Sequence, residues 1–304
     1  MVNALHHVAL AVRDPQQAAT FFHSAMGFEA ADMPLETGGS RFLRAPNCYL
    51  QLIPAQGGDA LPVHARPVNE PGITHFCVQS RKLDVLHASF ERAGAKFHSE
   101  PVGLGTGNLY CYARDPEANV IEIEGIPYVP EDQVPWLAHV ALATPDVGRL
   151  AEFYARVVNG TRLGGQKIGP NPLYDRITGL RDVEVIPYWV ASLNVLIELW
   201  QFLHPPTEAP TVPRPPGAAG YTHLCFEVDD VAAEVANFRS AGARFESSEM
   251  REEPGYRMAS GCDPDGNAIE LLEWRIAGAP SALALPDHDI VARMAELRRQ
   301  RELK

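Results

Sequence analysis

The stretch that decides the fold lies at the N-terminus. It reads LHHVALAV at residues 5–12 and recurs as LAHVALA at residues 137–143. Each copy is followed by an Asp-Pro or Pro-Asp pair and a helical stretch, which ends near Gly27 in the first copy and near Val158 in the second. Apolar alternation predicts a strand, and the segment after it has the spacing of an amphipathic helix. The chain therefore begins with a strand-helix unit that it uses again.

Two further pairs of segments show that the repeat covers most of the chain. ITHFCV at residues 73–78 matches YTHLCF at 221–226, and DPEANVIE at 115–122 matches DPDGNAIE at 263–270. The copies lie 132 residues apart for the first pair of segments and 148 apart for the other two. The halves are thus in register except for one insertion, which we place at residues 164–179, a segment rich in Gly and Pro.

The repeat predicts an α+β protein made of four βαβββ modules, paired into two cupped, mixed-sheet half-barrels. We expect an N-terminal domain of two modules at 1–130, a C-terminal domain of two modules at 131–276, and a tail at 277–304 with a basic, amphipathic helix at 289–303. The first expectation is that each cup forms within one half. Pairing across the halves, for example module one with module four, is the alternative.

The amino-acid composition indicates which classes of binding partner to expect. Lys+Arg number 26 against 38 Asp+Glu among 304 residues, and a formal charge of -12 disfavours nucleic acid and anionic membranes as partners. We find no run of about 18 apolar residues and no leader peptide. The five cysteines form no C-x-x-C pair. We therefore expect a cytoplasmic protein with a small-molecule substrate, and we leave a homodimer open.

Each half offers two histidines near the starts of equivalent strands and a glutamate in a closing strand. The sets are His7, His75 and Glu122 in the first half, and His139, His223 and Glu270 in the second. A fourth position joins them at equivalent places, Gln51 and Glu198. A carboxylate flanked by apolar residues on a central strand needs a cation. Imidazole mixed with carboxylate suits a divalent Fe(II), Mn, Co, Ni or Zn ion, so we expect metal binding.

The modules, the strand histidines and the D-P-x-x-N-x-I-E motif at residues 115–122 and 263–270 resemble the vicinal oxygen chelate superfamily, over roughly residues 4–275. That superfamily includes glyoxalase I, methylmalonyl-CoA epimerase, bleomycin- and fosfomycin-resistance proteins and type I extradiol dioxygenases. The resemblance implies tandem domains, each a cup with one metal held by the first and last strands of two modules. Carried over by position, His7, Gln51, His75 and Glu122 resemble the epimerase ligands, and His139, Glu198, His223 and Glu270 the bacterial glyoxalase ligands.

Two reaction classes follow from an ion that chelates two neighbouring substrate oxygens. In the first, a carboxylate moves a proton next to a carbonyl, as in an isomerase, epimerase or lyase; we expect Glu198 as the base and Glu270 as a ligand or second base. In the second, His139, His223 and Glu270 hold Fe(II) for extradiol cleavage of a catechol by O₂. A non-catalytic binding or resistance protein is the third reading.

Other residues receive simpler interpretations. The aromatic residues expected to line the cups are Tyr49, Tyr110, Tyr188, Trp189, Trp200 and Tyr256. The Asp-Pro motifs are interpreted as turns between strands rather than calcium loops, because Asp and Asn side chains bond to the backbone of such turns. His6, which lies off the motif, is expected at the surface. The basic stretch 298–301 is interpreted as a solvated helix face.

Overall fold

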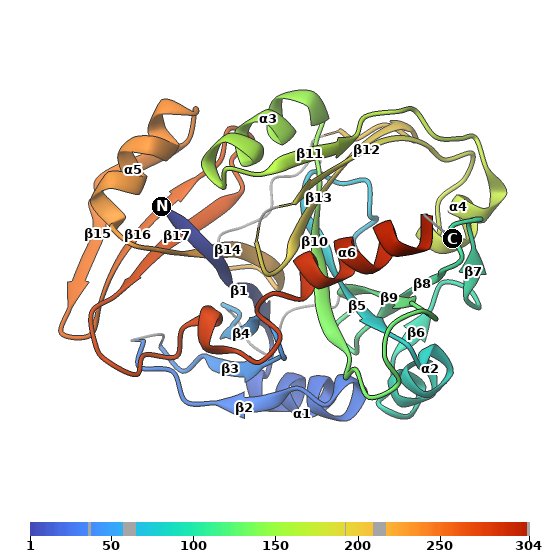
Figure 1. Cartoon of the computed structure of the whole chain (residues 1–304), viewed down its shortest axis with the longest axis horizontal. Coiled ribbons are helices and arrows are strands. Elements are labelled where there is room, and N and C mark those ends of the chain that lie inside the picture. Colours follow the sequence, from blue (N-terminus) through green and yellow to red (C-terminus); the bar gives the residue numbers. More distant parts are fainter. Residues whose placement is uncertain (36–37, 57–64, 192, 209–216, 303–304) are drawn as a thin grey trace.

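The structure is a computed structural model of the whole chain, and it describes residues 1–35, 38–56, 65–191, 193–208 and 217–302 (Figure 1). The expected βαβββ pattern occurs four times along the chain, with an additional short strand in module two and an additional helix in module three.

The bounds of the elements in the first two modules are as follows. Module one comprises β1 (Val2–Val12), α1 (Pro15–Met26), β2 (Glu29–Ala31), β3 (Arg41–Arg44) and β4 (Tyr49–Pro54). Module two comprises β5 (Gly72–Ser80), α2 (Leu83–Arg92), β6 (Lys96–Phe97), β7 (Val102–Gly103), β8 (Leu109–Arg114) and β9 (Val120–Gly125).

The second half repeats this order and adds a tail. Module three comprises β10 (Trp136–Ala143), α3 (Val147–Val157), β11 (Thr161–Gly164), α4 (Pro172–Thr178), β12 (Glu184–Ala191) and β13 (Leu196–His204). Module four comprises β14 (Gly220–Val228), α5 (Val231–Ser240), β15 (Arg244–Glu253), β16 (Tyr256–Cys262) and β17 (Ala268–Trp274). The tail carries the 3₁₀ helix η2 (Ala282–Ala284) and α6 (Ile290–Glu302). The rest of the expected tail helix, from residue 303, lies outside the described residues.

The modules pair across the halves. One sheet has the order β15-β16-β17-β14-β1-β4-β3-β2, and the other has the order β11-β12-β13-β10-β5-β9-β8-β6 with β7 beside β8. We call the sheet of modules one and four the outer cup and the sheet of modules two and three the inner cup. The expectation that each cup forms within one half is wrong, and the alternative pairing is confirmed: β1 pairs antiparallel with β14, and β10 with β5.

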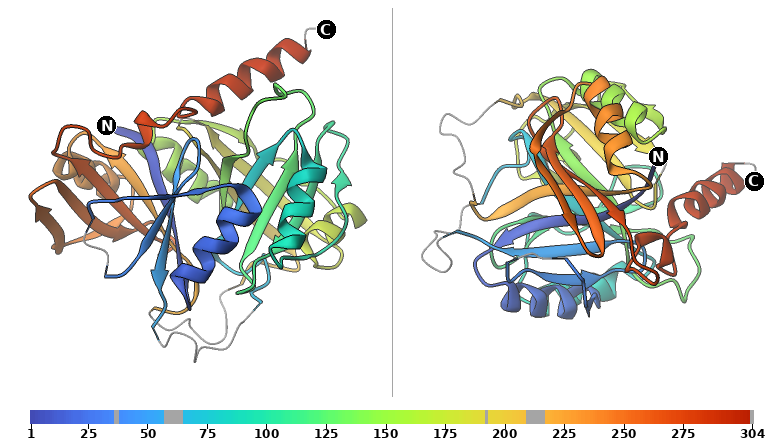
Figure 2. Two further views of the ribbon diagram at one scale, coloured as in Figure 1. Left: turned by 90° about the horizontal axis from the view of Figure 1, so that it is seen from below. Right: turned by 90° about the vertical axis from the view of Figure 1, so that its left-hand side faces the viewer.

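The two cups share one core. Leu5, Val8 and Leu10 of β1 and the equivalent Leu137, Val140 and Leu142 of β10 belong to a single cluster of buried side chains that also takes in helices α1, α2, α3 and α5. Figure 2 shows α1 and α2 on one side of the molecule and α3 and α5 on the other. Successive side chains of a strand point to opposite faces of the sheet. Where an apolar residue of β1 or β10 faces the core, the residues next to it along the strand therefore face the inside of a cup.

Asp-Pro motifs act at helix starts and at strand turns, as the sequence suggests. Asp14 caps α1 by accepting from the backbone of Gln16 at 2.8 Å, while Pro15 occupies the first turn. In the turn before β9, Asp115 Oδ1 accepts from the backbone N–H groups of residues 117 and 119. Asp263 makes the same contacts with residues 265 and 267. The turns are therefore closed by their own side chains, and they set where β9 and β17 begin.

The tail packs on the inner cup. Ile290 and Met294 of α6 are buried in a cluster with Trp136 and Ala138 of β10. In Figure 1 this helix crosses in front of β10. In the described part of the chain, every helix is too short or too polar to span a membrane.

Candidate metal centre

The inner cup brings together two ligand-type side chains from each of its modules. His75 on β5 and Glu122 on β9 come from module two, and His139 on β10 and Glu198 on β13 come from module three. One donor atom from each of the four residues lies within 4.8 Å of the others, and all four residues are buried. The ligand sets expected within each half are therefore regrouped by the pairing of the modules.

The contacts within this cluster join imidazole nitrogens to carboxylate oxygens. His139 Nε2 lies 2.8 Å from Glu122 Oε2 and 3.2 Å from Glu198 Oε2. His75 Nε2 lies 3.4 Å and 3.7 Å from the same two oxygens. Both imidazoles thus point one nitrogen at the same pair of carboxylates, as the ligands of a single ion would.

Glu198 Oε2 is the unsatisfied atom of the cluster. It is buried, and among the described residues it has no hydrogen-bond partner, because the contact to His139 lacks the alignment of a hydrogen bond. A buried carboxylate oxygen without a partner is costly in free energy. This atom is therefore an observation in favour of a cation that the four side chains would share.

The two buried carboxylates of the cluster favour a positive charge beside them, as the pKa shifts of Glu122 and His139 indicate. Burial would raise the pKa of Glu122, but the neighbouring imidazoles, His139 before His75, hold that pKa to about 2. Burial opposes a charged His139, yet the Glu198 and Glu122 carboxylates raise its pKa well above the ordinary value. Two carboxylates thus hold a proton on His139 at the centre of the cluster, where a divalent ion would replace it.

A threonine fixes which nitrogen of His75 faces the cluster. Thr74 Oγ1 donates to the carbonyl of Ala141 at 3.2 Å and lies 3.0 Å from His75 Nδ1. When the threonine proton goes to the carbonyl, His75 Nδ1 donates to Thr74, and His75 Nε2 keeps its lone pair for the cluster. Thr222 stands in the same relation to His223 and the Ala9 carbonyl in the outer cup. The repeated Thr-His dipeptide was a sequence signal for this arrangement, and sequence reasoning missed it.

The cluster forms the floor of a cavity of about 670 Å³. Glu122, His139 and Glu198 line it, and so do Tyr174 and Ile177 of α4 in the inserted segment. Of the aromatic residues expected in the cups, Tyr110, Trp189 and Trp200 line this cavity. Tyr49 and Tyr256 instead pack in a cluster of the outer cup, and Tyr188 packs against the shared core.

Sequence reasoning also missed a buried polar group beside the cluster. Glu124 accepts from Gln79 at 2.5 Å and from Asn108 at 2.8 Å. Burial, followed by the neighbouring Glu122 charge, raises the pKa of Glu124. Tyr112 OH lies 3.3 Å from His75 Nε2. These residues differ in type between the halves, so a comparison of the two copies could not mark them.

The outer cup holds the other four predicted residues in a less charged arrangement. His7 Nε2 lies 3.3 Å from His223 Nε2, which lies 3.3 Å from Glu270 Oε2. Gln51 occupies the register position of Glu198, since Ala9 pairs with Gln51 as Ala141 pairs with Glu198. The outer set therefore has one carboxylate where the inner set has two.

Glu270 is held by further groups. Ser260 Oγ donates to its Oε1 at 3.2 Å, and Arg251 lies 3.6 Å from that atom. Burial opposes a charged Glu270, but His223 and Arg251 lower its pKa. The expectation that Glu198 and Glu270 act together is wrong, because they lie in different cups.

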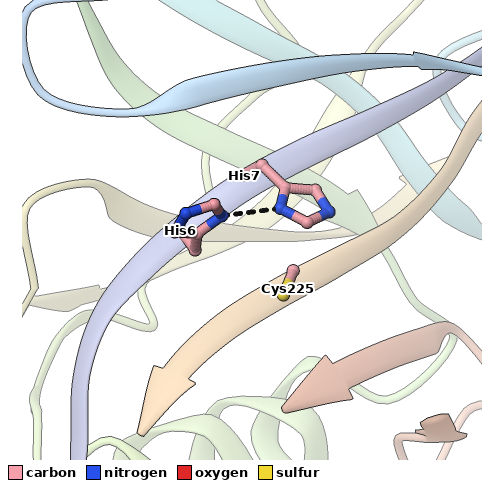
Figure 3. Close-up of side chains that lie close together, drawn as sticks. All are labelled: His6, His7 and Cys225. Atoms are coloured by element: carbon pink, nitrogen blue, oxygen red, sulfur yellow. Dashed lines mark hydrogen bonds between the residues drawn. The ribbon is translucent and has the colours of Figure 1, made fainter. Parts of the chain in front are cut away.

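His6 lies behind His7 in the outer cup. It is fully buried, so the expectation of a surface position is wrong. His6 Nε2 lies 3.0 Å from the Pro280 carbonyl, which can only accept, and His6 Nδ1 lies 2.8 Å from His7 Nδ1 (Figure 3). Burial lowers the pKa of His6 to about 4. Neutral His6 therefore donates through Nε2 and accepts through Nδ1, so that His7 donates from Nδ1 and keeps the lone pair on Nε2.

Cys225 lies near these histidines on the neighbouring strand β14 (Figure 3). Burial, with the Glu270 carboxylate second, raises the pKa of Cys225 well above its usual range. Both ring nitrogens of His6 already have partners in Pro280 and His7, so His6 has no nitrogen left for an ion beside Cys225. We therefore interpret His6 as an orienting partner of His7, not as a ligand with Cys225.

Comparison with known proteins agrees with this architecture. The model of the Glyoxalase/Bleomycin resistance protein/Dioxygenase superfamily matches residues 4–123 and 136–271. Glyoxalase I from Zea mays superposes with a TM-score of 0.63 at 20% identity, over 90% of this chain and 92% of that chain. A Bacillus subtilis protein assigned provisionally as a dioxygenase superposes with a TM-score of 0.63 at 12% identity. That superposition covers 98% of this chain and 96% of that chain.

One curated relative, the uncharacterized protein YaeR of Escherichia coli strain K12, is 37% identical over 78 residues. The match spans 57% of that protein and 26% of this chain, so this chain covers just over half the length of the relative. The solved structures support the fold alone at their level of identity, whereas the family model covers most of the sequence in two regions. The chain belongs to the Glyoxalase/Bleomycin resistance protein/Dioxygenase superfamily.

Proposed function

We propose that the inner cup binds one divalent metal ion and that the protein is an isomerase or lyase of the glyoxalase type. The reaction would move a proton on the carbon next to a substrate carbonyl. The observation that carries this proposal is the buried cluster of His75, Glu122, His139 and Glu198 at the floor of a 670 Å³ cavity. A cavity of this size suits a small-molecule substrate.

The donor set fits the proposed ion. Two imidazole nitrogens and two carboxylates suit Fe(II), Mn, Co, Ni or Zn, and the unpaired Glu198 oxygen would gain a partner. When bound, such an ion would polarise a carbonyl and stabilise negative charge on two neighbouring substrate oxygens. The net charge of the two carboxylates matches that of the ion.

Glu198 is the proposed base. Its side chain lines the cavity that a substrate would occupy, and its buried Oε2 has no hydrogen-bond partner within the described residues. Glu122 accepts from His139 at 2.8 Å and is better suited to remain a ligand. A base must come within hydrogen-bond reach of the proton that it removes. Trp189, Trp200 and Tyr174 would exclude water from that space.

The dioxygenase and binding-protein readings fit the inner cup less well. Extradiol cleavage needs open positions for both a catechol and O₂, and a fourth side-chain ligand at Glu198 competes for them. A protein that only sequesters a ligand has no need for the charged cluster. The five free cysteines, four of which are buried, suit the reducing cytoplasm that we propose as the location.

The test uses a conservative substitution in each cup. The protein is loaded in turn with each candidate ion and incubated in D₂O with small α-hydroxy aldehydes and ketones, and deuterium uptake next to the carbonyl is followed by NMR. Glu198→Gln should reduce exchange by a factor of about 100 or more, the range of general base catalysis, while elemental analysis still finds metal. The matched variant Glu270→Gln, in the outer cup, should leave exchange unchanged.

The same preparations separate the alternatives. Oxygen consumption with catechols by the Fe(II)-loaded protein, without deuterium exchange, would assign the dioxygenase reaction instead. Full exchange activity in Glu198→Gln would remove Glu198 from the role of base. Tight binding of a substrate analogue to metal-free protein, with neither reaction, would support the non-catalytic reading.

A further inference from the structure

We propose that Arg298 and Arg301 of α6 form an anion-binding subsite at the mouth of the inner-cup cavity. The substrate would then carry a carboxylate or phosphate group at the end remote from its metal-facing oxygens. The assignment of this group to a substrate rests on the function proposed above. The site itself lies in the tail, beyond the region that matches the family model.

The cavity connects the two regions. Its lining includes Glu122 and Glu198 of the cluster and also Arg298 and Arg301 of α6. Three polar residues, Thr106, Asn108 and Tyr110, line the cavity as well. One molecule could therefore contact both the cluster and the helix.

Packing holds the helix against the inner cup. Met294 is buried one turn before Arg298, in the cluster that includes Trp136, and Leu297 packs on the same cluster. Arg298 Nε donates to Tyr128 OH at 3.2 Å. The guanidinium of Arg301 lies over the Tyr128 ring, 3.9 Å from its centroid. Tyr128 thus places both arginines, which reduces the entropy lost when they bind a ligand.

The two arginines differ from their neighbours in having no carboxylate partner. Arg299 pairs with Glu296, and Arg293 pairs with Asp287 and Asp289. Among the described residues, no carboxylate oxygen lies within 4.0 Å of Arg298 or Arg301. The side-chain hydrogen bond of Arg298 runs from Nε to Tyr128, which leaves both of its Nη atoms without an acceptor in that part of the chain. An arginine with free Nη groups presents a planar fork that fits a carboxylate or phosphate.

The charge distribution favours an anion at this end of the cavity. Glu122, Glu124 and Glu198 make the floor negative, and the proposed ion would offset two of these charges. An anionic group on the substrate would be repelled by any charge left at the floor and attracted to the arginines. Burial lowers the pKa of Arg298, but the Tyr128 contact and the Glu124 charge raise it overall, so the guanidinium is fully charged. This difference in charge between the two ends of the cavity would orient a substrate with its anionic group toward the arginines.

The first experiment measures the subsite without the metal. Isothermal titration calorimetry compares 2-naphthoate, 2-naphthyl phosphate and the uncharged 2-naphthamide on metal-free protein. We expect the better of the two anions to bind about tenfold tighter than the amide, as one charge-assisted hydrogen bond would give, and the preferred anion identifies the group. Arg298→Gln/Arg301→Gln should abolish the preference, and the matched Arg299→Gln should retain it.

The second experiment places the same group on a metal-binding probe. Benzohydroxamate and 4-carboxybenzohydroxamate are titrated into metal-loaded protein, and the carboxylated probe should bind about tenfold tighter to the wild type but not to the double variant. Equal affinities for the charged and uncharged probes in both experiments, or a preference that survives the double substitution, would overturn the anion subsite.

The outcomes also separate this inference from the proposed function. Tight hydroxamate binding without any gain from the carboxylate would leave the metal centre in place and refute the subsite. An anion preference in metal-free protein that the double variant loses, combined with hydroxamates that do not bind, would support the subsite and refute the metal chemistry.

Discussion

The two cups have the same four candidate ligand positions, but the side chains at those positions differ in charge. The inner cup has two histidines and two glutamates, all buried, whereas the outer cup has two histidines, one glutamate and Gln51. The outer glutamate, Glu270, also has Arg251 beside it. Because an amide carries no charge, the outer set attracts a divalent ion less strongly than the inner set. The comparison indicates that the number of carboxylates, not their position, distinguishes the two centres.

Removal of a carboxylate ligand should have the largest effect, and it should differ between the cups. Glu122→Ala should lower metal affinity of the inner cup by more than about 100-fold, beyond the range for loss of an outer-shell partner. The matched Glu270→Ala should leave that affinity unchanged. Titration of each metal-free variant with Zn(II) or Ni(II), followed by elemental analysis, measures the change. An equal loss of inner-cup metal affinity in Glu122→Ala and Glu270→Ala would contradict the assignment of the inner cup as the stronger metal centre.

Addition of a carboxylate should make the outer cup resemble the inner one. Gln51→Glu would place a second carboxylate at the register position of Glu198, and we expect metal affinity of the outer cup to rise by about tenfold or more. The measurement is the number of ions retained per chain after dialysis. An unchanged count would show that Arg251 or packing, rather than the amide, limits this cup.

The threonines that orient His75 and His223 should have intermediate effects, each confined to its own cup. Thr74→Val keeps the shape of the side chain but removes the acceptor for His75 Nδ1. Metal affinity of the inner cup should then fall by about 10-fold, at the lower end of the range for an outer-shell partner. Thr222→Val is the matched control, and competition with a chromogenic chelator gives both affinities. An unchanged inner-cup affinity in Thr74→Val, or an equal loss there from Thr222→Val, would refute the orienting role of Thr74.

The smallest expected effect concerns stability. Burial raises the pKa of Asp115 to about 6. A carboxyl whose folded pKa exceeds its unfolded value favours folding at low pH, and that contribution is lost as pH rises through about 6. Relative to Asp115→Asn, the wild type should gain about 1 kcal/mol between pH 7 and pH 5. Urea unfolding at the two pH values measures it.

Asp263 provides the comparison for this turn. It makes the same backbone contacts but also accepts from Tyr154 OH at 2.9 Å. Burial raises the pKa of Asp263, while the contacts from Asn267 and Tyr154 lower it. We therefore expect the stability difference between the wild type and Asp263→Asn to change less with pH than the difference between the wild type and Asp115→Asn. A stronger dependence at Asp263 than at Asp115 would contradict this reading of the turns.

The local features of the fold could be predicted from the sequence, but the partner of each module could not. Alternation marked β1 and β10, and the Asp-Pro pairs marked the turns, because these signals depend on neighbouring residues. All four modules begin with the same kind of apolar strand, so the pattern does not say whether β1 pairs with β5 or with β14. Since that choice was hidden, all eight candidate ligands were named, but their first grouping within each half was wrong.

The polar surroundings of the ligands were also hidden in the sequence. His6 looked like a surface residue because its burial depends on Pro280 in the distant tail. Arg298 looked solvated because its place at the cavity depends on how α6 packs on Trp136. Such contacts join segments that are far apart along the chain, and no local period encodes them.

Cross-pairing gives the two halves of this chain the relation of two subunits. Each cup takes two of its four candidate ligands from either side of residues 126–135, so both centres are interface sites within a single polypeptide. The connection keeps the halves at the high effective concentration that a tethered pair enjoys. A substitution that weakens the strand pairing between β1 and β14 would therefore favour separation of the outer-cup modules, as a weakened interface does in a dimer. A cut between the halves would make the assembly of both centres depend on protein concentration.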